Sequence, residues 1–179
     1  MKIRTLILLS LFLLCLFVPA FAQREEASCG VEGWVVDNDP KGLNVRAKPN
    51  VNAKVIARLA TRPNTEMDFV IVYIVGYSNG WLKIARAENF DGEKIFDEIG
   101  WVSAKMVATG TKGDDGKYEK PATLYTEPRT NSRKAGTIPS ETEVKLVGFT
   151  CGFIQVSYNG VTGWLRTANV CPNPVTTCP

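Results

Sequence analysis

The sequence predicts an all-β protein made of short strands, and three observations lead to this fold class. Apolar and polar residues alternate in short runs bounded by Gly, Pro, Asn and Asp, the pattern of strands and turns. No segment keeps apolar residues at helical spacing over about 10–12 positions, the length expected of a helix. Two segments repeat the same order of motifs, including the Gly-Trp pairs at 100–101 and 163–164, which is typical of a duplicated unit.

The expected strands follow one another from about residue 33 onward. They cover 33–37, 43–47, 54–60, 67–77, 80–87 and 99–107, and then 122–128, 143–149, 153–158, 162–166 and 168–170. Residues 54–60 follow a polar turn, so we interpret them as a bent strand or loop edge rather than a helical turn. The sequences DPKG (39–42), YSNG (77–80), NFDG (89–92) and SYNG (157–160) tolerate positive φ and predict hairpin connections.

Residues 1–22 have the features of a cleaved signal peptide. A basic start precedes an apolar run from Leu6 to Val18, and Ala20 and Ala22 supply the small residues that cleavage requires. The run is shorter than the roughly 20 apolar residues of a membrane-spanning helix. We therefore expect a secreted or periplasmic protein without stable membrane insertion, and an uncleaved anchor is the alternative.

The remaining chain is nearly neutral. The net charge of +3 includes Lys2 and Arg4, and it falls by two when these residues leave with the signal. No run of Lys and Arg typical of nucleic-acid binding is present. We therefore expect no nucleic-acid partner.

Four cysteines remain after Cys15 leaves with the signal: Cys29, Cys151, Cys171 and Cys178. An even number in an exported chain predicts two disulfides, for which three connectivities exist. The chain has no histidine, which excludes Ser-His and Cys-His catalytic pairs and His-containing zinc sites. A four-cysteine zinc site is disfavoured because no close CxxC pair is present.

Composition divides the chain after the signal into two domains. Residues 108–120 contain several glycines and charges and almost nothing apolar, so we expect a linker or long exposed loop there. This linker separates a first domain at 30–107 from a second at 121–171, followed by a tail at 172–179. The smaller second domain is marginal in size without covalent staples.

The two domains align with each other and resemble the bacterial type of Src homology 3 (SH3) domain. LNVRAKP (43–49), NGWLKIA (79–85) and IGWVSAKMV (99–107) follow the order of that family's motifs. The second domain resembles the family more loosely: it keeps Pro128, Gly163 and Trp164 but has Phe153 where the first has Trp81. The surplus of the first domain, residues 85–99, is expected to be an inserted hairpin.

The resemblance implies a small five-stranded barrel for each domain and an aromatic groove that binds extended peptides. The most similar positions are Tyr77, Trp81 and Trp101, with Phe153 and Trp164 as equivalents in the second domain. The alternative is that these rings mainly fill small barrels.

The resemblance also bears on the disulfides. It implies that Cys151 and Cys171 lie on the same side of the second barrel, which favours the pairs Cys151–Cys171 and Cys29–Cys178. In the first domain, Arg46 alternates with apolar residues, and we expect it to brace the following loop by donating to nearby carbonyls rather than to contact a ligand.

We expect neither catalysis nor a metal or other cofactor. Asp91, Glu93, Asp97 and Glu98 cluster in the inserted hairpin, where a carboxylate pair would suit a glycoside hydrolase, but loop carboxylates are mostly solvated. The sequences at 37–40 and 113–116 invite a calcium interpretation, yet neither has the ligand spacing of a calcium loop.

The leading functional hypothesis is an exported, non-catalytic binding module for cell-wall peptide or an envelope protein partner. We expect it to act as an independent binder or as an adaptor for a separate envelope protein. The alternative is a secreted, disulfide-stapled enzyme inhibitor that uses the inserted hairpin as its probe. Fold alone does not decide between these functions.

Overall fold

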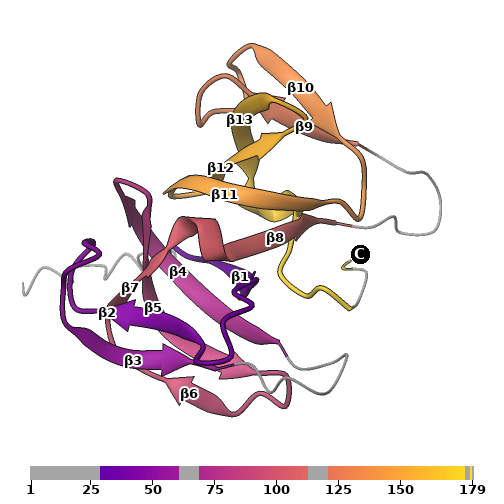
Figure 1. Cartoon of the computed structure of the whole chain (residues 1–179). Coiled ribbons are helices and arrows are strands. Elements are labelled where there is room, and N and C mark those ends of the chain that lie inside the picture. Colours follow the sequence, from indigo (N-terminus) through magenta and orange to yellow (C-terminus); the bar gives the residue numbers. More distant parts are fainter. Residues whose placement is uncertain (1–28, 61–68, 113–120, 176–177, 179) are drawn as a thin grey trace, which may run out of the picture.

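The computed structural model describes residues 29–60, 69–112, 121–175 and 178, and in this part of the chain the regular structure is almost entirely β (Figure 1). The first half contains β1 (Val31–Val35), β2 (Leu43–Arg46), β3 (Val55–Leu59), β4 (Val70–Ser78), β5 (Trp81–Asn89), β6 (Lys94–Phe96), β7 (Gly100–Ser103) and β8 (Val107–Thr111). The second half contains β9 (Ala122–Tyr125), β10 (Lys134–Ile138), β11 (Glu143–Thr150), β12 (Phe153–Tyr158), β13 (Val161–Arg166) and β14 (Val170–Cys171). Two short 3₁₀ helices, η2 (Ala104–Met106) and η3 (Thr167–Asn169), precede β8 and β14. The all-β prediction is confirmed.

The strands form one open antiparallel sheet that runs through both halves. Its order is β10-β9-β13-β12-β11-β8-β1-β4-β5-β7-β2-β3, with β14 beside β8 and β6 beside β5. The sequence predicted two barrels, each complete in itself, but the described strands do not separate in this way. β8 is the reason, because it pairs with strands of both halves and lies between the two lobes in Figure 1.

The strand order is repeated on the two sides of β8. The order β3-β2-β7-β5-β4-β1-β8 in the first half corresponds to β10-β9-β13-β12-β11-β8-β14 in the second. β8 therefore ends the first unit and begins the second. Ala108 pairs with Trp34 of β1 on one side and with Lys145 of β11 on the other.

Individual hydrogen bonds repeat as well. Three backbone N–H to carbonyl hydrogen bonds of the first half each have an equivalent in the second half. The bond from Ala47 to Lys54 corresponds to that from Thr126 to Arg133, and the bond from Ala104 to Gly80 corresponds to that from Thr167 to Gly152. The bond from Val36 to Met106 corresponds to that from Lys112 to Asn169. Their donor–acceptor distances lie between 2.9 and 3.0 Å. The two halves thus share a detailed backbone plan in spite of their different sequences.

The predicted linker is wrong at its beginning. Residues 108–111 belong to β8, all of whose residues are buried, and the rest of the segment from residue 113 lies outside the described residues. Two buried threonines explain how a polar sequence occupies this place. The Thr109 hydroxyl donates to the carbonyl oxygens of Cys171 (3.2 Å) and Glu32 (3.4 Å), and that of Thr111 donates to the carbonyl oxygen of Pro139 (2.7 Å).

The core follows from strand alternation. The first four side chains of both β5 and β12 alternate between half-buried and buried positions, as expected for strands with one face toward the core. One cluster of buried apolar side chains contains residues of both halves, including Val72, Ile84, Leu146, Ile154 and Leu165. The second half therefore shares its core with the first.

Four predicted turns have the expected backbone. Gly42, Gly80, Gly92 and Gly160 have φ values between 77° and 83°. Asn79 and Asn159, with φ of 48° and 46°, precede two of them, giving the Asn-Gly geometry of tight hairpins. β10 was missed, because its sequence KAGTI alternates weakly and contains Gly136.

Candidate binding surface

The outer face of the first half carries two of the predicted aromatic residues side by side. Trp81 lies opposite Ser103, and Lys83 lies opposite Trp101, in the pairing of β5 with β7. Directly opposed residues share a face of the sheet, so Trp81 and Trp101 lie on the same face. Both are half-buried, which leaves part of each ring in contact with solvent.

Tyr77 does not join this face. It lies opposite Leu82, which is fully buried and therefore points to the core side. Tyr77 is 37% exposed at the end of β4. β4 has register shifts between Tyr73 and Ile74 and again before Gly76, which interrupt the alternation of its side chains ahead of Tyr77.

Arg46 braces the loop that follows it, as predicted. Its Nη1 donates to the carbonyl oxygen of Ala53 at 2.8 Å, between the two ends of the β2–β3 connection. Arg46 also lies opposite Trp101 in the pairing of β2 with β7. Its position is thus beside the aromatic face while its guanidinium serves the loop.

The equivalent face of the second half is richer in aromatic contacts. Trp164 lies between Tyr125 of β9 and Gln155 of β12, and Phe153 lies opposite Arg166. The rings of Tyr125 and Phe153 meet edge to face, with centroids 6.3 Å apart and an interplanar angle of 88°. We call Tyr125, Phe153 and Trp164 the second aromatic face.

The register aligns the two faces residue by residue. The equivalent pairs are Trp81 and Phe153, Trp101 and Trp164, Arg46 and Tyr125, Lys83 and Gln155, and Ser103 and Arg166. The strand register thus agrees with the predicted match of Trp81 with Phe153. Tyr125 and Arg166 were missed as site residues, although counting by two along the strand from Trp164 would have found Arg166.

A polar pocket of about 250 Å³ adjoins the second aromatic face. It is lined by Lys112, Pro121, Ala122, Thr123, Tyr125, Arg166 and Asn169. Tyr125 therefore belongs to both the second aromatic face and the pocket, and Arg166 of the pocket lies opposite Phe153 of that face. Two cationic side chains and no carboxylate are among the described residues that line it.

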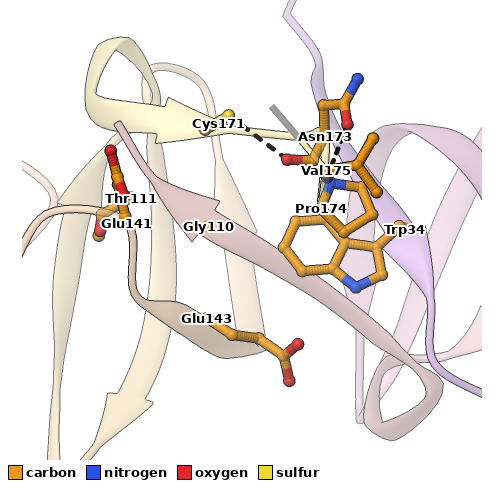
Figure 2. A pocket seen from close by; sticks show the side chains of 9 residues that line it. All are labelled: Trp34, Gly110, Thr111, Glu141, Glu143, Cys171, Asn173, Pro174 and Val175. Carbon is orange, nitrogen blue, oxygen red and sulfur yellow. Dashed lines mark hydrogen bonds between the residues drawn. The ribbon is translucent and has the colours of Figure 1, made fainter. Parts of the chain in front are cut away.

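A second cavity, of about 300 Å³, lies beside Trp34 (Figure 2). Pro174 and Val175 of the tail and the carboxylates of Glu141 and Glu143 line it. Trp34 is only 6% exposed and packs with Phe69 and Ala108 in a small cluster. Trp34 is therefore a packing residue.

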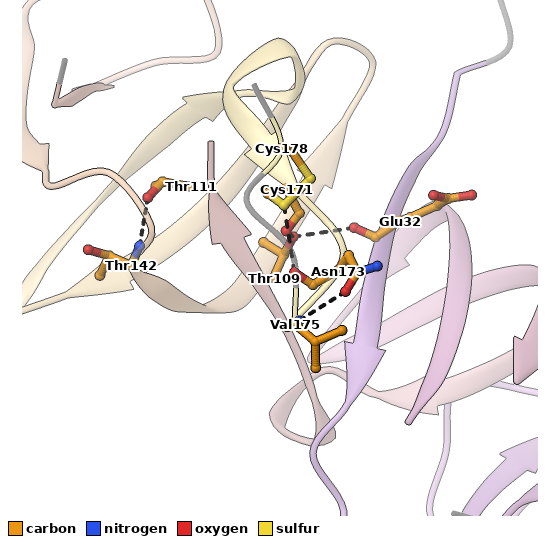
Figure 3. Close-up of a disulfide and its surroundings, with 8 residues drawn as sticks. All are labelled: Glu32, Thr109, Thr111, Thr142, Cys171, Asn173, Val175 and Cys178. Carbon is orange, nitrogen blue, oxygen red and sulfur yellow. Dashed lines mark hydrogen bonds between the residues drawn. A yellow bond between two sulfur atoms is a disulfide. The ribbon is translucent and has the colours of Figure 1, made fainter. Parts of the chain in front are cut away.

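The disulfide pairing differs from the prediction. Cys29 pairs with Cys151, and Cys171 pairs with Cys178. The first bond joins the segment before β1 to the β11–β12 turn, because β11 bends toward the first half and packs against β4 and η2. The second bond joins Cys171 at the end of β14 to Cys178 of the predicted tail (Figure 3).

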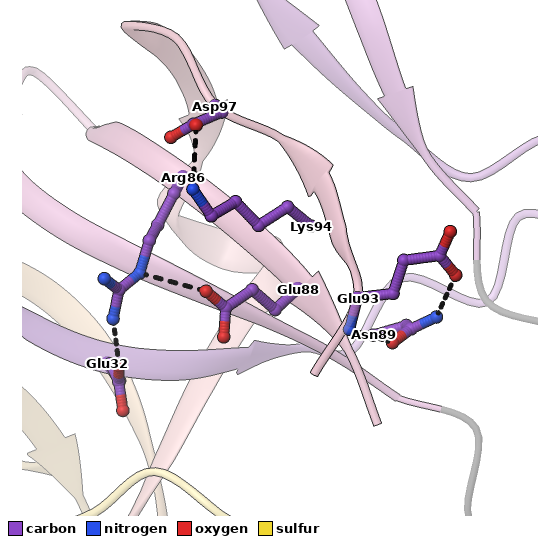
Figure 4. Close-up of polar contacts among 7 residues, drawn as sticks. All are labelled: Glu32, Arg86, Glu88, Asn89, Glu93, Lys94 and Asp97. Carbon is purple, nitrogen blue, oxygen red and sulfur yellow. Dashed lines mark hydrogen bonds and ion pairs between the residues drawn. The ribbon is translucent and has the colours of Figure 1, made fainter. Parts of the chain in front are cut away.

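The inserted hairpin is present, as β5 and β6, and local contacts occupy two of the four carboxylates considered for catalysis, Glu93 and Asp97 (Figure 4). Glu93 accepts a hydrogen bond from the Asn89 amide at 3.1 Å, and Asp97 forms an ion pair with Lys94 at 3.1 Å. Deeper in β5, Arg86 pairs with Glu32 at 3.0 Å and stacks on the ring of Tyr73, 4.8 Å from its centroid. These contacts stabilise the hairpin.

Metal-binding geometry is not found in the described ranges, where no group of three or more His, Cys, Asp or Glu side chains converges. At 37–40, the carboxylates of Asp37 and Asp39 instead accept the backbone N–H groups of Asp39 and Lys41. The other calcium candidate, 113–116, lies outside the described residues. Within those residues, no helix is long and apolar enough to cross a membrane.

Comparison with known families gives a match for the second half of the chain. Residues 120–170 match the family described as the bacterial SH3 domain. The match falls on the second domain, whose motifs resemble the family more loosely than those of the first, and a first copy at 30–107 stays a prediction. No curated protein matches the chain.

Three solved structures share limited similarity with the chain, each at 18% identity. NlpC1 from Trichomonas vaginalis has a TM-score of 0.32 over 81% of this chain and 46% of that chain, and NlpC2 from the same organism has 0.31 over 80% and 48%. An NlpC/P60 family protein from Bacillus cereus ATCC 10987 has 0.25 over 64% and 37%. The chain thus spans less than half the length of these proteins, and at such TM-scores they do not bear on its function.

Proposed function

We propose that the protein is an exported, non-catalytic binding module of two SH3-like units, with cell-wall peptide as its first candidate ligand and an envelope protein as its second. The match of residues 120–170 to the bacterial SH3 domain and the repeated strand order support the two units. The two disulfides are consistent with a location outside the cytoplasm.

The second aromatic face is the observation that carries the proposal. Tyr125 and Phe153 form an edge-to-face pair next to half-buried Trp164, on the outer side of a sheet rather than in the core. Aromatic rings at a sheet surface offer contact area with little side-chain entropy to lose, as peptide-binding sites require. The equivalent Trp81 and Trp101 give the first half a similar but less connected face.

Co-sedimentation with purified peptidoglycan tests the proposal. We expect the full-length mature protein to sediment with the wall, and the variants Phe153→Ala and Trp81→Ala to sediment less. Val51→Ala is a suitable control, because Val51 is an exposed apolar residue in the β2–β3 connection. Failure to sediment, combined with capture of one envelope protein that depends on Phe153, would assign the adaptor role. Failure of both would contradict a binding module.

An enzyme inhibitor is the second candidate, and the hairpin of β5 and β6 favours it. Phe90 near the hairpin turn is 41% exposed, and Ile95 on β6 is 40% exposed. Phe90 also contacts Phe69 edge to face at 5.3 Å between centroids, which steadies the hairpin. Inhibition of a wall hydrolase that is lost on shortening 89–95, with peptidoglycan binding unchanged, would favour this role.

A further inference from the structure

We infer that the polar pocket beside the second aromatic face binds the carboxylate of a peptide ligand, so that the second half, and not the first, recognises an acidic group. This inference rests on the proposed binding function and specifies which part of a peptide is recognised. It starts from Arg166, the exposed cation that lines the pocket beside Tyr125.

The fold sets Lys112 and Arg166 at one edge of the second half. Lys112 directly follows β8, and its backbone N–H donates to the carbonyl oxygen of Asn169 at 2.9 Å, which places the end of β8 against η3. Arg166 ends β13, where it is exposed and lies opposite Phe153. Thr123 and Asn169 add a hydroxyl and an amide to the same lining.

This arrangement suits a carboxylate. The guanidinium of Arg166 can bind a carboxylate through two parallel N–H bonds. The adjoining Tyr125 and Phe153 rings supply an apolar shelf for the side chain next to that carboxylate. Inorganic phosphate would interact with the cationic side chain but would make no apolar contact with these rings.

The first half has uncharged residues at the positions of Lys112 and Arg166, and its Arg46, which takes the place of Tyr125, donates to the Ala53 carbonyl oxygen instead. Repeated hydrogen bonds and strand register place Val36 where the second half has Lys112, and Ser103 where it has Arg166. The first half can therefore serve as an internal comparison for the second half. The variant Arg166→Ser gives the second half the residue that the first half carries.

The test is an NMR titration of the mature protein with N-acetyl-phenylalanyl-alanine, its C-terminal amide, and inorganic phosphate. We expect the free acid to shift the backbone amide signals of Thr123, Arg166 and Asn169. The amide should bind about tenfold more weakly, the size expected for loss of a charge-assisted hydrogen bond. Arg166→Ser should weaken binding of the free acid by a similar factor and remove the difference in affinity between the acid and the amide.

Arg58→Ser is the matched control, because Arg58 is exposed on β3, away from the pocket; it should leave all three titrations unchanged. Equal binding of acid and amide, an unaltered affinity in Arg166→Ser, or phosphate binding as tight as the acid would each overturn the inference. If the wild-type protein still sediments with peptidoglycan in these cases, the proposed function stands without this inference. Absence of both sedimentation and peptide shifts would overturn the two together.

Discussion

Single residues in this protein are placed by strand alternation until a bulge intervenes. Alternation predicts that Trp101 lies on an outer face, and it does so opposite Lys83. Tyr77 does not follow this alternation, because the pairing of β4 with β5 shifts register twice before Tyr77. A bulge depends on the partner strand as well as on local sequence, so the strand pairing places Trp81 and Trp101 on one face and Tyr77 on the other.

Arg46 is expected to contribute to stability through the loop that it braces. Arg46→Ala removes the charged donor of the 2.8 Å bond to the Ala53 carbonyl oxygen, which should lower the free energy of unfolding by about 1.5–3 kcal/mol. Urea unfolding followed by tryptophan fluorescence measures it. Arg58→Ala, at an exposed position of β3, should change stability by less than about 0.5 kcal/mol. Equal effects of the two variants would contradict the bracing role.

The turn residue Gly160 is a second test at this scale. It has φ of 79° and open space where a Cβ would lie, so Gly160→Ala should cost about 1 kcal/mol through backbone conformation alone. Gly136 in β10 has no positive φ, and a Cβ there would meet Val161 at an ordinary 3.7 Å. Gly136→Ala should therefore be neutral or stabilising in the same urea experiment. A reversed order would refute the assigned turn geometry.

Among the elements, β8 joins the two halves. β11 occupies one side of β8, while β1 and then β14 occupy the other. Thr109 lies where the partner changes, and its hydroxyl reaches the carbonyl oxygens of Glu32 and Cys171 from β1 and β14 (Figure 3). One buried side chain therefore connects the beginning of the first unit to the end of the second.

Thr109→Val tests this junction, because valine keeps the shape of threonine without its hydroxyl. Thr109 is fully buried, so we expect a loss of about 1–3 kcal/mol from carbonyl oxygens left without their donor. Differential scanning calorimetry gives the change. The control, Thr162→Val on an exposed position of β13, should leave the transition nearly unchanged. A stable Thr109→Val variant would show that the hydroxyl is not needed where β1 gives way to β14.

The elements also show what a sequence can and cannot reveal. Turns such as Asn79-Gly80 and the hairpin of β5 and β6 depend on neighbouring residues, and both were predicted. The pairing of β8 with strands of both halves depends on residues far away in the sequence. Composition alone suggested a linker, because Thr109, Gly110 and Thr111 look like loop residues until their buried partners are known.

At the scale of the whole molecule, a shared strand, a shared core and Cys29–Cys151 hold the halves together. The predicted disulfides assumed that each half is stapled within itself or at its ends. The bend of β11, which brings Cys151 to the first half, is a tertiary feature that no local pattern encodes. The same sharing explains why a second unit of about fifty residues needs no separate core.

Removal of the disulfides should have unequal effects. Cys29 and Cys151 are 122 residues apart, whereas Cys171 and Cys178 are 7 apart. Constraint of the unfolded chain gives about 5 kcal/mol for the long loop and about 2 kcal/mol for the short one. Replacing both cysteines of one pair by serine, and comparing urea midpoints, measures each. A larger loss from the short loop would contradict this account.

The central claim is that the outer face of the second half binds peptide from the cell envelope. The most direct measurement is an NMR titration of the mature protein with soluble cell-wall peptides released from peptidoglycan. We expect the shifted signals to gather on Tyr125, Phe153, Trp164 and Arg166, with smaller shifts at Trp81 and Trp101. No shifts at any concentration, or shifts confined to the hairpin of β5 and β6, would contradict the claim.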